Sequence, residues 1–291
     1  MTANFDICEQ ISQYAVESLL YEVSATPKPG LVDRRNAGAH KDMDYFTFMS
    51  STAALAHYFY KSAVLGAEAA QKDPADLFNN LRALGIEAEK RMFEATGGVN
   101  THKGLVFSLG IICAAAASCY FENNGSKLDC EIISSKIIKM TRGLSERELT
   151  ASQNKEKMTY GEKIYKKYGI KGIRGEAESG YSTVLSTSLP VMRELVNSRA
   201  ADINDILVQV LLYLMTVSED TNVIARHDLC ILEYVKEYAR RALSLGGIFT
   251  EEGRKIIYEM DEDFIKKNIS PGGSADLLAV TVMFYLLESM K

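Results

Sequence analysis

Five polar, glycine-containing segments interrupt a chain that is otherwise patterned as apolar helices, and these segments could carry chemistry. Each lies before or between stretches of helical periodicity, so each is expected at the end of a helix. The first turn of a helix offers unpaired N–H groups and a partial positive charge, which suits anions. Glycine lets the backbone approach a phosphate closely. The segments are 26–44 (TPKPGLVDRRNAGAHKDMD), 97–104 (GGVNTHKG), 171–181 (KGIRGEAESGY), 218–228 (SEDTNVIARHD) and 270–277 (SPGGSADL).

Basic and acidic residues recur together in these segments. Carboxylates and phosphate oxygens bind Mg²⁺, while Lys and Arg neutralise the remaining phosphate charge. The combination therefore predicts a magnesium–polyphosphate site. The basic residues are Lys28, Arg34, Arg35, Lys103, Arg174 and Arg226, and the acidic ones are Asp33, Asp42, Glu176, Glu178, Asp220 and Asp276.

Each segment taken alone also has a plain structural interpretation. Segment 270–277 is consistent with a helix cap at Ser270 or Ser274, and His102 with a hydrogen-bonded structural histidine. Known phosphate-binding motifs do not fit: Gly98 to Lys103 lacks the second glycine of a P-loop, and no GxGxxG follows a strand. GxSxG, HExxH and kinase motifs are absent from the sequence too. A phosphate site would have to be assembled from helix ends.

The order of the motifs resembles one family. ATPKPGLVDRRNAGAHKDMD, GGVNTHKGLVFSLG, RGEAESGY, EDTNVIAR and PGGSADLLA are similar to the successive motifs of the triphosphoribosyl-dephospho-coenzyme A synthases, over about residues 20 to 287. In that family two glycines often follow the arginine of the DTN segment. Here His227 and Asp228 follow Arg226, which leaves the role of that turn open.

The resemblance implies an all-helical enzyme that joins ATP to 3′-dephospho-coenzyme A and releases adenine. The product would be the precursor of the prosthetic group on the acyl carrier subunit of citrate lyase, or of malonate decarboxylase in a sister branch. A separate transferase would attach it. The sequence does not choose between the two pathways and does not give the oligomeric state.

The implied reaction is attack by the 2′-hydroxyl of dephospho-coenzyme A on C1′ of the ATP ribose. Breaking an N-glycosidic bond builds oxocarbenium character, so the site needs a carboxylate, a base for the hydroxyl and a proton or hydrogen bond for adenine. We expect Glu176 or Glu178 as base or metal ligand, Asp220 and Asp276 as Mg²⁺ ligands, His102 as a contact to phosphate or adenine, and Lys28, Arg34, Lys103, Arg174 and the helix starts at Thr101 and Ser274 as phosphate contacts.

Two other functions share these features. A magnesium-dependent hydrolase of an N-ribosyl bond would release adenine from ATP without any acceptor. A helical nucleotide-binding or scaffold protein would bind ATP and release no adenine. The fold alone does not separate the three.

The stretches that must position these segments show helical periodicity almost throughout. This periodicity predicts an all-α protein, a single globular domain over residues 1–291, with about ten to twelve helices by the mean helix length. Asp73-Pro74 and Thr250 are expected to begin helices, Ser145 and Glu148 to form a capping box, and Gly246-Gly247 to end a long helix that begins near Thr221.

The run 104–121 has no charged residue. A membrane span usually needs about 20 apolar residues with aromatic and basic flanks, so a buried central helix is the better interpretation.

Composition narrows the class of protein. A net charge of −5 argues against binding to nucleic acid or an anionic membrane. The five cysteines show no CxxC spacing, and the first residues, MTANFDICEQ, show no secretory pattern. We therefore expect a reduced, cytoplasmic enzyme. Residues 146–169 are polar and lysine-rich, and they fit either a solvated helix or a lid.

Overall fold

The structure is a computed structural model that describes residues 2–150, 158–199 and 201–290. Those residues form helices and no strand, so the predicted all-α class is confirmed. They contain fourteen α-helices, more than the ten to twelve predicted, because short helices such as α6, α8 and α11 leave little periodicity in the sequence. The first seven are α1 (Thr2–Ser24), α2 (Tyr45–Glu68), α3 (Pro74–Ala95), α4 (Lys103–Glu122), α5 (Cys130–Thr141), α6 (Leu144–Thr150) and α7 (Tyr160–Tyr168). The others are α8 (Ile173–Glu178), α9 (Leu189–Ser198), α10 (Ile203–Val217), α11 (Thr221–Arg226), α12 (Leu229–Ser244), α13 (Glu251–Lys267) and α14 (Gly272–Glu288).

Helix α4 is the buried centre of the fold, as the uncharged run predicts. By length and composition it is the one helix of the described residues that could cross a membrane, but 78% of its apolar window is buried inside the protein. Helices α1, α2, α3, α5 and α14 pack around it. Its apolar surface is therefore covered by protein.

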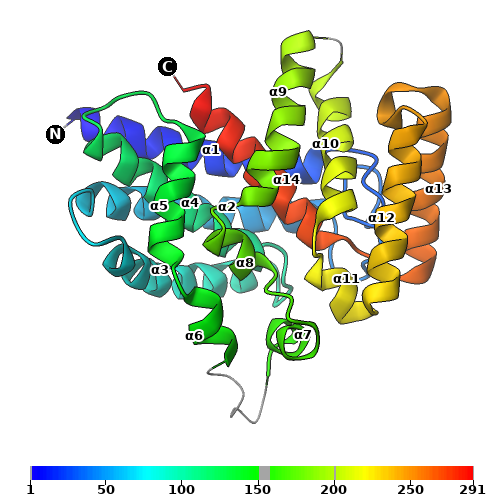
Figure 1. Ribbon diagram of the computed structural model, residues 1–291, viewed down its shortest axis with the longest axis horizontal. Coiled ribbons are helices and arrows are strands. Elements are labelled where there is room, and N and C mark those ends of the chain that lie inside the picture. The colour runs from blue at the N-terminus through cyan, green and yellow to red at the C-terminus, as the bar shows by residue number, and fades with distance from the viewer. Residues whose placement is uncertain (1, 151–157, 200, 291) are drawn as a thin grey trace.

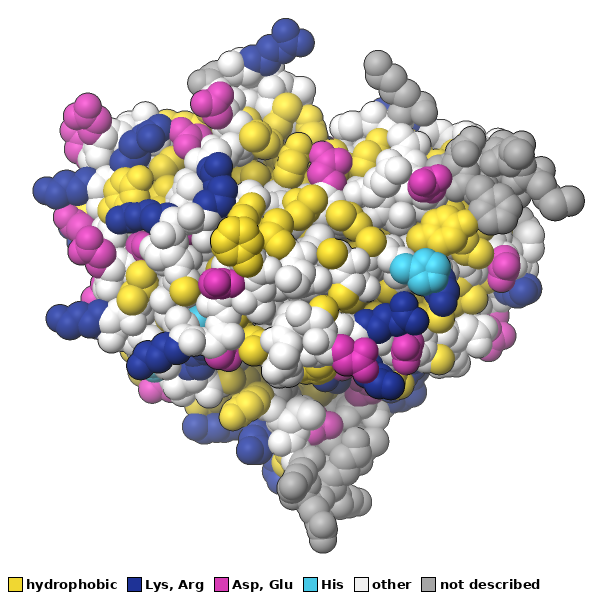
Figure 2. All heavy atoms as spheres, turned by 180° about the vertical axis from the view of Figure 1, so that it is seen from behind, with side chains coloured by type: hydrophobic (Ala, Val, Ile, Leu, Met, Phe, Trp, Pro, Cys, Tyr) yellow, Lys and Arg dark blue, Asp and Glu magenta, His cyan; other side chains and the backbone are white. Residues whose placement is uncertain are grey.

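The helices form two groups joined by α14 (Figure 1). One group consists of α1 to α5, and the other contains α9, α10 and the antiparallel pair α12 and α13. Helix α14 packs on α1 and α4 in the first group and on α9 and α10 in the second. The short helices α7, α8 and α11 lie together at the lower middle of the view, and α7 packs against α11 (Figure 1). On the opposite face, Lys and Arg side chains are interspersed with Asp and Glu (Figure 2).

Most of the predicted helix starts are confirmed. The Asp73 carboxylate accepts a hydrogen bond from the N–H of Ala75, and the Thr250 hydroxyl accepts one from Gly253. The capping box at Ser145 is wrong, because α6 begins one residue earlier, at Leu144. The Ser145 N–H is instead capped by Glu178 from another helix, at 3.0 Å.

Two longer helices are interrupted. The helix predicted from Thr221 to the glycine pair is two helices, because Asp228 caps a new one by accepting a hydrogen bond from the N–H of Ile231. Pro190 lies in the first turn of α9, directly after a π-helical turn, η2 (Val184–Ser188). A proline ring cannot continue regular helical hydrogen bonding, so a local change of helix type precedes it.

Two helical glycines offer a matched test of packing around α4. A Cβ added at Gly66 of α2 would lie 2.0 Å from the Ala114 carbonyl oxygen of α4, whereas one at Gly85 of α3 would meet only the Tyr58 hydroxyl, at 3.6 Å. We expect Gly66→Ala to destabilise the protein by about 1–3 kcal/mol, since the two backbones must separate. We expect Gly85→Ala to stabilise it by about 0.5–1 kcal/mol through helix propensity. Urea unfolding measures both, and equal effects would contradict this packing.

Candidate active site

All five polar segments line one cleft of about 1190 Å³. The starts of α4, α8, α11 and α14 and the loop between α1 and α2 face it. The start of α7 lines it as well, through Thr159, Tyr160 and Gly161. Small-molecule pockets usually measure about 300–1,000 Å³. The cleft is therefore large enough for more than one nucleotide-sized ligand.

A buried ion pair and a second carboxylate form the floor of the cleft. Lys28 and Glu22 are 1% and 3% exposed, and they pair with each other. Asp276 lies against the first turn of α4, where a Cβ added at Gly104 would be 2.1 Å from its Oδ2 atom. The pKa of Asp276 is raised well above its ordinary value by loss of solvent and by the charges of Glu22 and Asp220. Among the described residues no hydrogen-bond donor reaches Asp276, so this carboxylate is available to a ligand.

Asp220 holds two helix starts together. Its Oδ1 atom accepts hydrogen bonds from the N–H groups of Asn222 and Val223, and its Oδ2 atom from the N–H and hydroxyl of Ser274. Ser274 is fully buried and also bonds Ser218, at 2.7 Å. Ser274 is not among the residues that line the cleft, whereas Gly272 and Gly273 at the start of α14 are. Four hydrogen bonds also leave Asp220 little capacity to bind a metal.

The two glutamates of α8 point to different places. Glu176 lines the cleft; its Oε1 atom accepts a hydrogen bond from the Thr183 hydroxyl at 2.7 Å, and its buried Oε2 atom has no partner among the described residues. Burial raises the pKa of Glu176. Glu178 lies outside the cleft lining and bonds the N–H of Ser145 and the ammonium of Lys171. Burial acts to raise the pKa of Glu178, but these bonds outweigh it and lower the value.

His102 borders the cleft as a neutral imidazole. It is 1% exposed, and burial, assisted by the charge of Lys28, lowers its pKa to about 3. Its Nδ1 atom lies 2.7 Å from the Ser51 hydroxyl, which also accepts a hydrogen bond from Thr101. Its Nε2 atom is buried without a partner among the described residues. His102 therefore cannot act as an imidazolium acid near neutral pH, which narrows its expected catalytic role to hydrogen bonding.

The cations on one side of the cleft are already paired with carboxylates. Lys103 lies 2.8 Å from Glu89, and Arg174 lies 2.6 Å from Glu148. Both line the cleft, as predicted. Arg34 does not: its guanidinium donates to Asn204 at 2.8 Å, away from the cleft lining.

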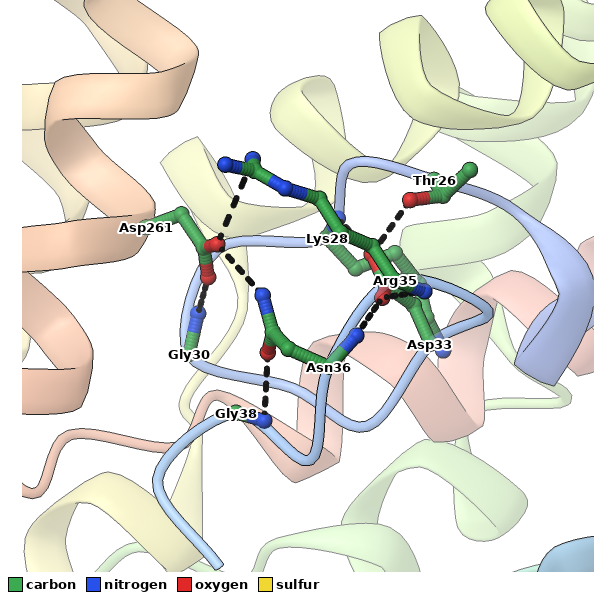
Figure 3. A network of polar contacts seen from close by, with 8 residues as sticks. All are labelled: Thr26, Lys28, Gly30, Asp33, Arg35, Asn36, Gly38 and Asp261. Atoms are coloured by element: carbon green, nitrogen blue, oxygen red, sulfur yellow. Dashed lines mark hydrogen bonds and ion pairs between the residues drawn. The ribbon is translucent and has the colours of Figure 1, made fainter. Parts of the chain in front are cut away.

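The loop carrying Lys28 is held by two carboxylates (Figure 3). Asp33 accepts hydrogen bonds from the Thr26 hydroxyl and from the backbone N–H groups of Lys28, Arg35 and Asn36. Asp261 of α13 accepts from the N–H of Gly30 and the side chain of Asn36. Asp33 is thus a structural residue of the loop, although its sequence context suggested a site carboxylate.

The carboxylates do not form an all-protein metal cage. Within the described residues no three His, Cys, Asp or Glu side chains are grouped to hold a metal ion. Mg²⁺ commonly uses one or two carboxylates together with substrate phosphates and water. Asp276, and Glu176 through its free oxygen, suit that mode.

Several residues that line the cleft were not among the site residues expected from the sequence. Glu22 is one of four acidic residues of α1 and belongs to no motif, so nothing in the sequence sets it apart. His40, Tyr160 and Lys171 also line the cleft. Part of the polar segment 146–169 lies outside the described residues, so its prediction as a lid or a solvated helix stays open.

The fold and the cleft define an all-helical protein with one large polar cleft that is built from helix starts and loops. The chain belongs to the family of ATP:dephospho-CoA triphosphoribosyl transferases, which it matches over residues 8–291.

Curated relatives support the same family. The 2-(5″-triphosphoribosyl)-3′-dephosphocoenzyme-A synthase of Klebsiella pneumoniae is 40% identical over 273 residues, covering 94% of this chain and 89% of the relative. Probable synthases of the same name from Vibrio cholerae and Lactiplantibacillus plantarum are 40% and 41% identical, covering 98% and 95% of this chain and 90% and 96% of the relatives. No solved structure matches the chain.

The buried neutral His102 predicts a pH dependence of stability. The unfolded histidine binds a proton below about pH 6.5, whereas the folded one does so only near pH 3. Stability attributable to His102 therefore falls as the pH drops through this window, by up to about 1.4 kcal/mol per pH unit. We expect His102→Gln to flatten the loss of unfolding free energy between pH 7 and 5, measured with urea. His57 is exposed, so His57→Gln should show the same dependence of the unfolding free energy on pH as the wild type. The same dependence in all three proteins would contradict the prediction.

Proposed function

We propose that this chain transfers the triphosphoribosyl group of ATP to the 2′-hydroxyl of 3′-dephospho-coenzyme A and releases adenine. The observation that carries the proposal is the meeting of all five family motifs in one cleft of about 1190 Å³. The reaction needs two anionic nucleotides held together, and the size and polar lining of the cleft suit both.

The transfer is a substitution at C1′ of the ATP ribose. The 2′-oxygen of dephospho-coenzyme A forms the new bond to C1′, and the bond from C1′ to the adenine nitrogen breaks. The hydroxyl proton passes to a base, and adenine leaves with the bonding electron pair and takes up a proton. The triphosphate stays on the ribose.

Glu176 is our choice for the base. Its free Oε2 atom faces no protein donor among the described residues, and Thr183 holds its other oxygen. The raised pKa of Glu176 makes it a better proton acceptor than an ordinary carboxylate. Asp276 lies deeper and is our choice for stabilising positive charge. His102, being neutral, fits a hydrogen bond to a substrate rather than proton donation.

Mg²⁺ is the proposed cofactor, held by Asp276 together with substrate phosphates and water, while Glu176 keeps its free oxygen for the proton. When bound, the ion neutralises triphosphate charge that these carboxylates would otherwise repel. Lys103 and Arg174, with the starts of α4 and α14, are placed to contact phosphate oxygens after exchanging their present carboxylate partners. Lys28, paired with Glu22 in the floor of the cleft, is proposed to attract the phosphates from below.

The product is proposed to be the precursor of the prosthetic group of citrate lyase, or of malonate decarboxylase, which a separate transferase attaches to the acyl carrier subunit. We propose a cytoplasmic location, where both nucleotides are available. The five cysteines, all free thiols, suit a reducing compartment.

The purified chain should release adenine from ATP only when dephospho-coenzyme A is present, because the acceptor hydroxyl is the nucleophile. Chromatography measures adenine, and mass spectrometry identifies the triphosphoribosyl adduct. Treatment with EDTA should abolish turnover, and added Mg²⁺ should restore it. Adenine released at the same rate without acceptor would indicate a hydrolase. Binding of both nucleotides without any release would indicate a scaffold.

Two carboxylate variants test the placement of the metal. Asp276→Asn should raise the Mg²⁺ concentration needed for half-maximal turnover and lower kcat by at least about a hundredfold, because one metal ligand loses its charge. Glu178→Gln should change kcat by less than about threefold, because this carboxylate bonds Ser145 and Lys171 outside the cleft. Thermal unfolding checks that both variants fold. Equal losses in the two variants would argue against this assignment.

A further inference from the structure

Arg226 differs from the other cations that line the cleft. Lys103, Lys171 and Arg174 each lie within 3.3 Å of a carboxylate oxygen. Arg226 has no carboxylate within ion-pair distance among the described residues. It contacts the Ala39 carbonyl at 3.3 Å, the Asn268 amide oxygen at 3.3 Å and the ring nitrogens of His40 at 3.4 Å.

The groups around Arg226 leave its charge available. Loss of solvent lowers the pKa of Arg226, while Asp42 and Asp220 act through space to raise it. Asp42 is 64% exposed and lies 3.8 Å from His40, and Asp220 is occupied by its four hydrogen bonds. Burial and the charge of Arg226 lower the pKa of His40, which favours a neutral ring. Arg226 is exposed and keeps its proton in such surroundings, so the cleft holds a positive charge that no carboxylate of the described residues contacts directly.

Groups that can bind an anion lie near Arg226. The His40 Nε2 atom lies 2.9 Å from the hydroxyl of Ser270, which is 2% exposed. Gly272 and Gly273, the first residues of the long helix α14, line the same cleft as Arg226 and Ser270. A guanidinium matches the geometry of phosphate oxygens and can bind two of them at once.

His227, the residue after Arg226, bonds the same asparagine that Arg226 contacts. His227 ends α11 and donates from Nε2 to the backbone carbonyl of Asn268, at 3.0 Å. Asn268 is left-handed, with φ 59°, and its side-chain oxygen accepts the bond from Arg226. Asp228 caps α12 directly afterwards. The turn after Arg226 is therefore held on one side by His227 at the end of α13 and on the other by Asp228 at the start of α12.

We propose that Arg226, oriented by His227 through Asn268, binds a phosphate group of a nucleotide substrate beside His40 and Ser270. This subsite rests on the proposed function, since the nucleotides of that reaction supply the phosphate. Two sources have the same chemistry: the triphosphate of ATP and the diphosphate of dephospho-coenzyme A. The paired cations around α7 and α8 lie on other elements, which leaves room for the second oligophosphate there.

The subsite is tested by calorimetry on Arg226→Gln. The binding of MgATP and the binding of dephospho-coenzyme A are measured separately. We expect at least a tenfold weaker affinity for one nucleotide, a matching rise in its KM, and less than a threefold change for the other. Arg226→Lys should recover part of the loss. Arg240→Gln, on the surface of α12 and paired with Glu233 and Glu237, is the control and should bind both nucleotides like wild type. A loss for MgATP identifies the triphosphate, and a loss for dephospho-coenzyme A the diphosphate.

Unchanged affinity for both nucleotides, or equal weakening for both, overturns the subsite. Wild-type protein that binds a nucleotide but releases no adenine overturns the transfer reaction alone, and the same binding data still judge Arg226. Wild-type protein that binds neither nucleotide overturns both proposals.

His227 provides the test of positioning. His227→Ala should raise the KM of the same nucleotide about threefold to tenfold and leave kcat within about twofold, because the bond to the Asn268 carbonyl is lost. His227→Gln keeps an N–H donor and should restore KM. A parallel fall of kcat in both variants, or failure of glutamine to rescue, would contradict the positioning role.

Discussion

The four hydrogen bonds to Asp220 are the constraint on which the cleft depends. One carboxylate holds the first turn of α11 through Asn222 and Val223 and the first turn of α14 through Ser274. These two helices carry Arg226 and Asp276 into the cleft. Removing a buried acceptor leaves several donors without partners, and each such group costs about 1–3 kcal/mol. Asp220 therefore determines where the functional groups lie without itself being free to bind a ligand.

The protein alone does not balance all the charges that line the cleft, so a charged ligand is needed to complete them. Most cations at the edge of the cleft are neutralised by carboxylates, whereas Asp276 and the free oxygen of Glu176 have no protein donor among the described residues. Loss of solvent raises the pKa values of both carboxylates, and their charged forms would repel a polyphosphate. A divalent cation that arrives with the phosphates reverses that repulsion. Arg226, which lines the same cleft, is the cation there that no carboxylate contacts directly among the described residues.

The sequence alone determined the class of fold and the segments that meet. Period-3.6 hydrophobicity and the uncharged run 104–121 specify buried helices, because each helix must cover its apolar face. Caps such as Asp73 and Thr250 are local, so they could be read from neighbouring residues. The ordered motifs identified the family, and all five do line the cleft.

Only the tertiary structure decided which residues of each motif line the cleft and which make structural contacts. Glu176 and Glu178 are two residues apart on one short helix, yet one faces the cleft and the other caps α6, because a step of two residues turns about 200° around a helix. Asp33 accepts hydrogen bonds from backbone N–H groups of its own loop, Ser274 donates to the buried Asp220, and Arg34 donates to Asn204. Glu22 reached the floor from a helix that showed no motif. The sequence carries residue types and spacing, whereas the partner of a charged side chain depends on contacts between segments far apart in the chain.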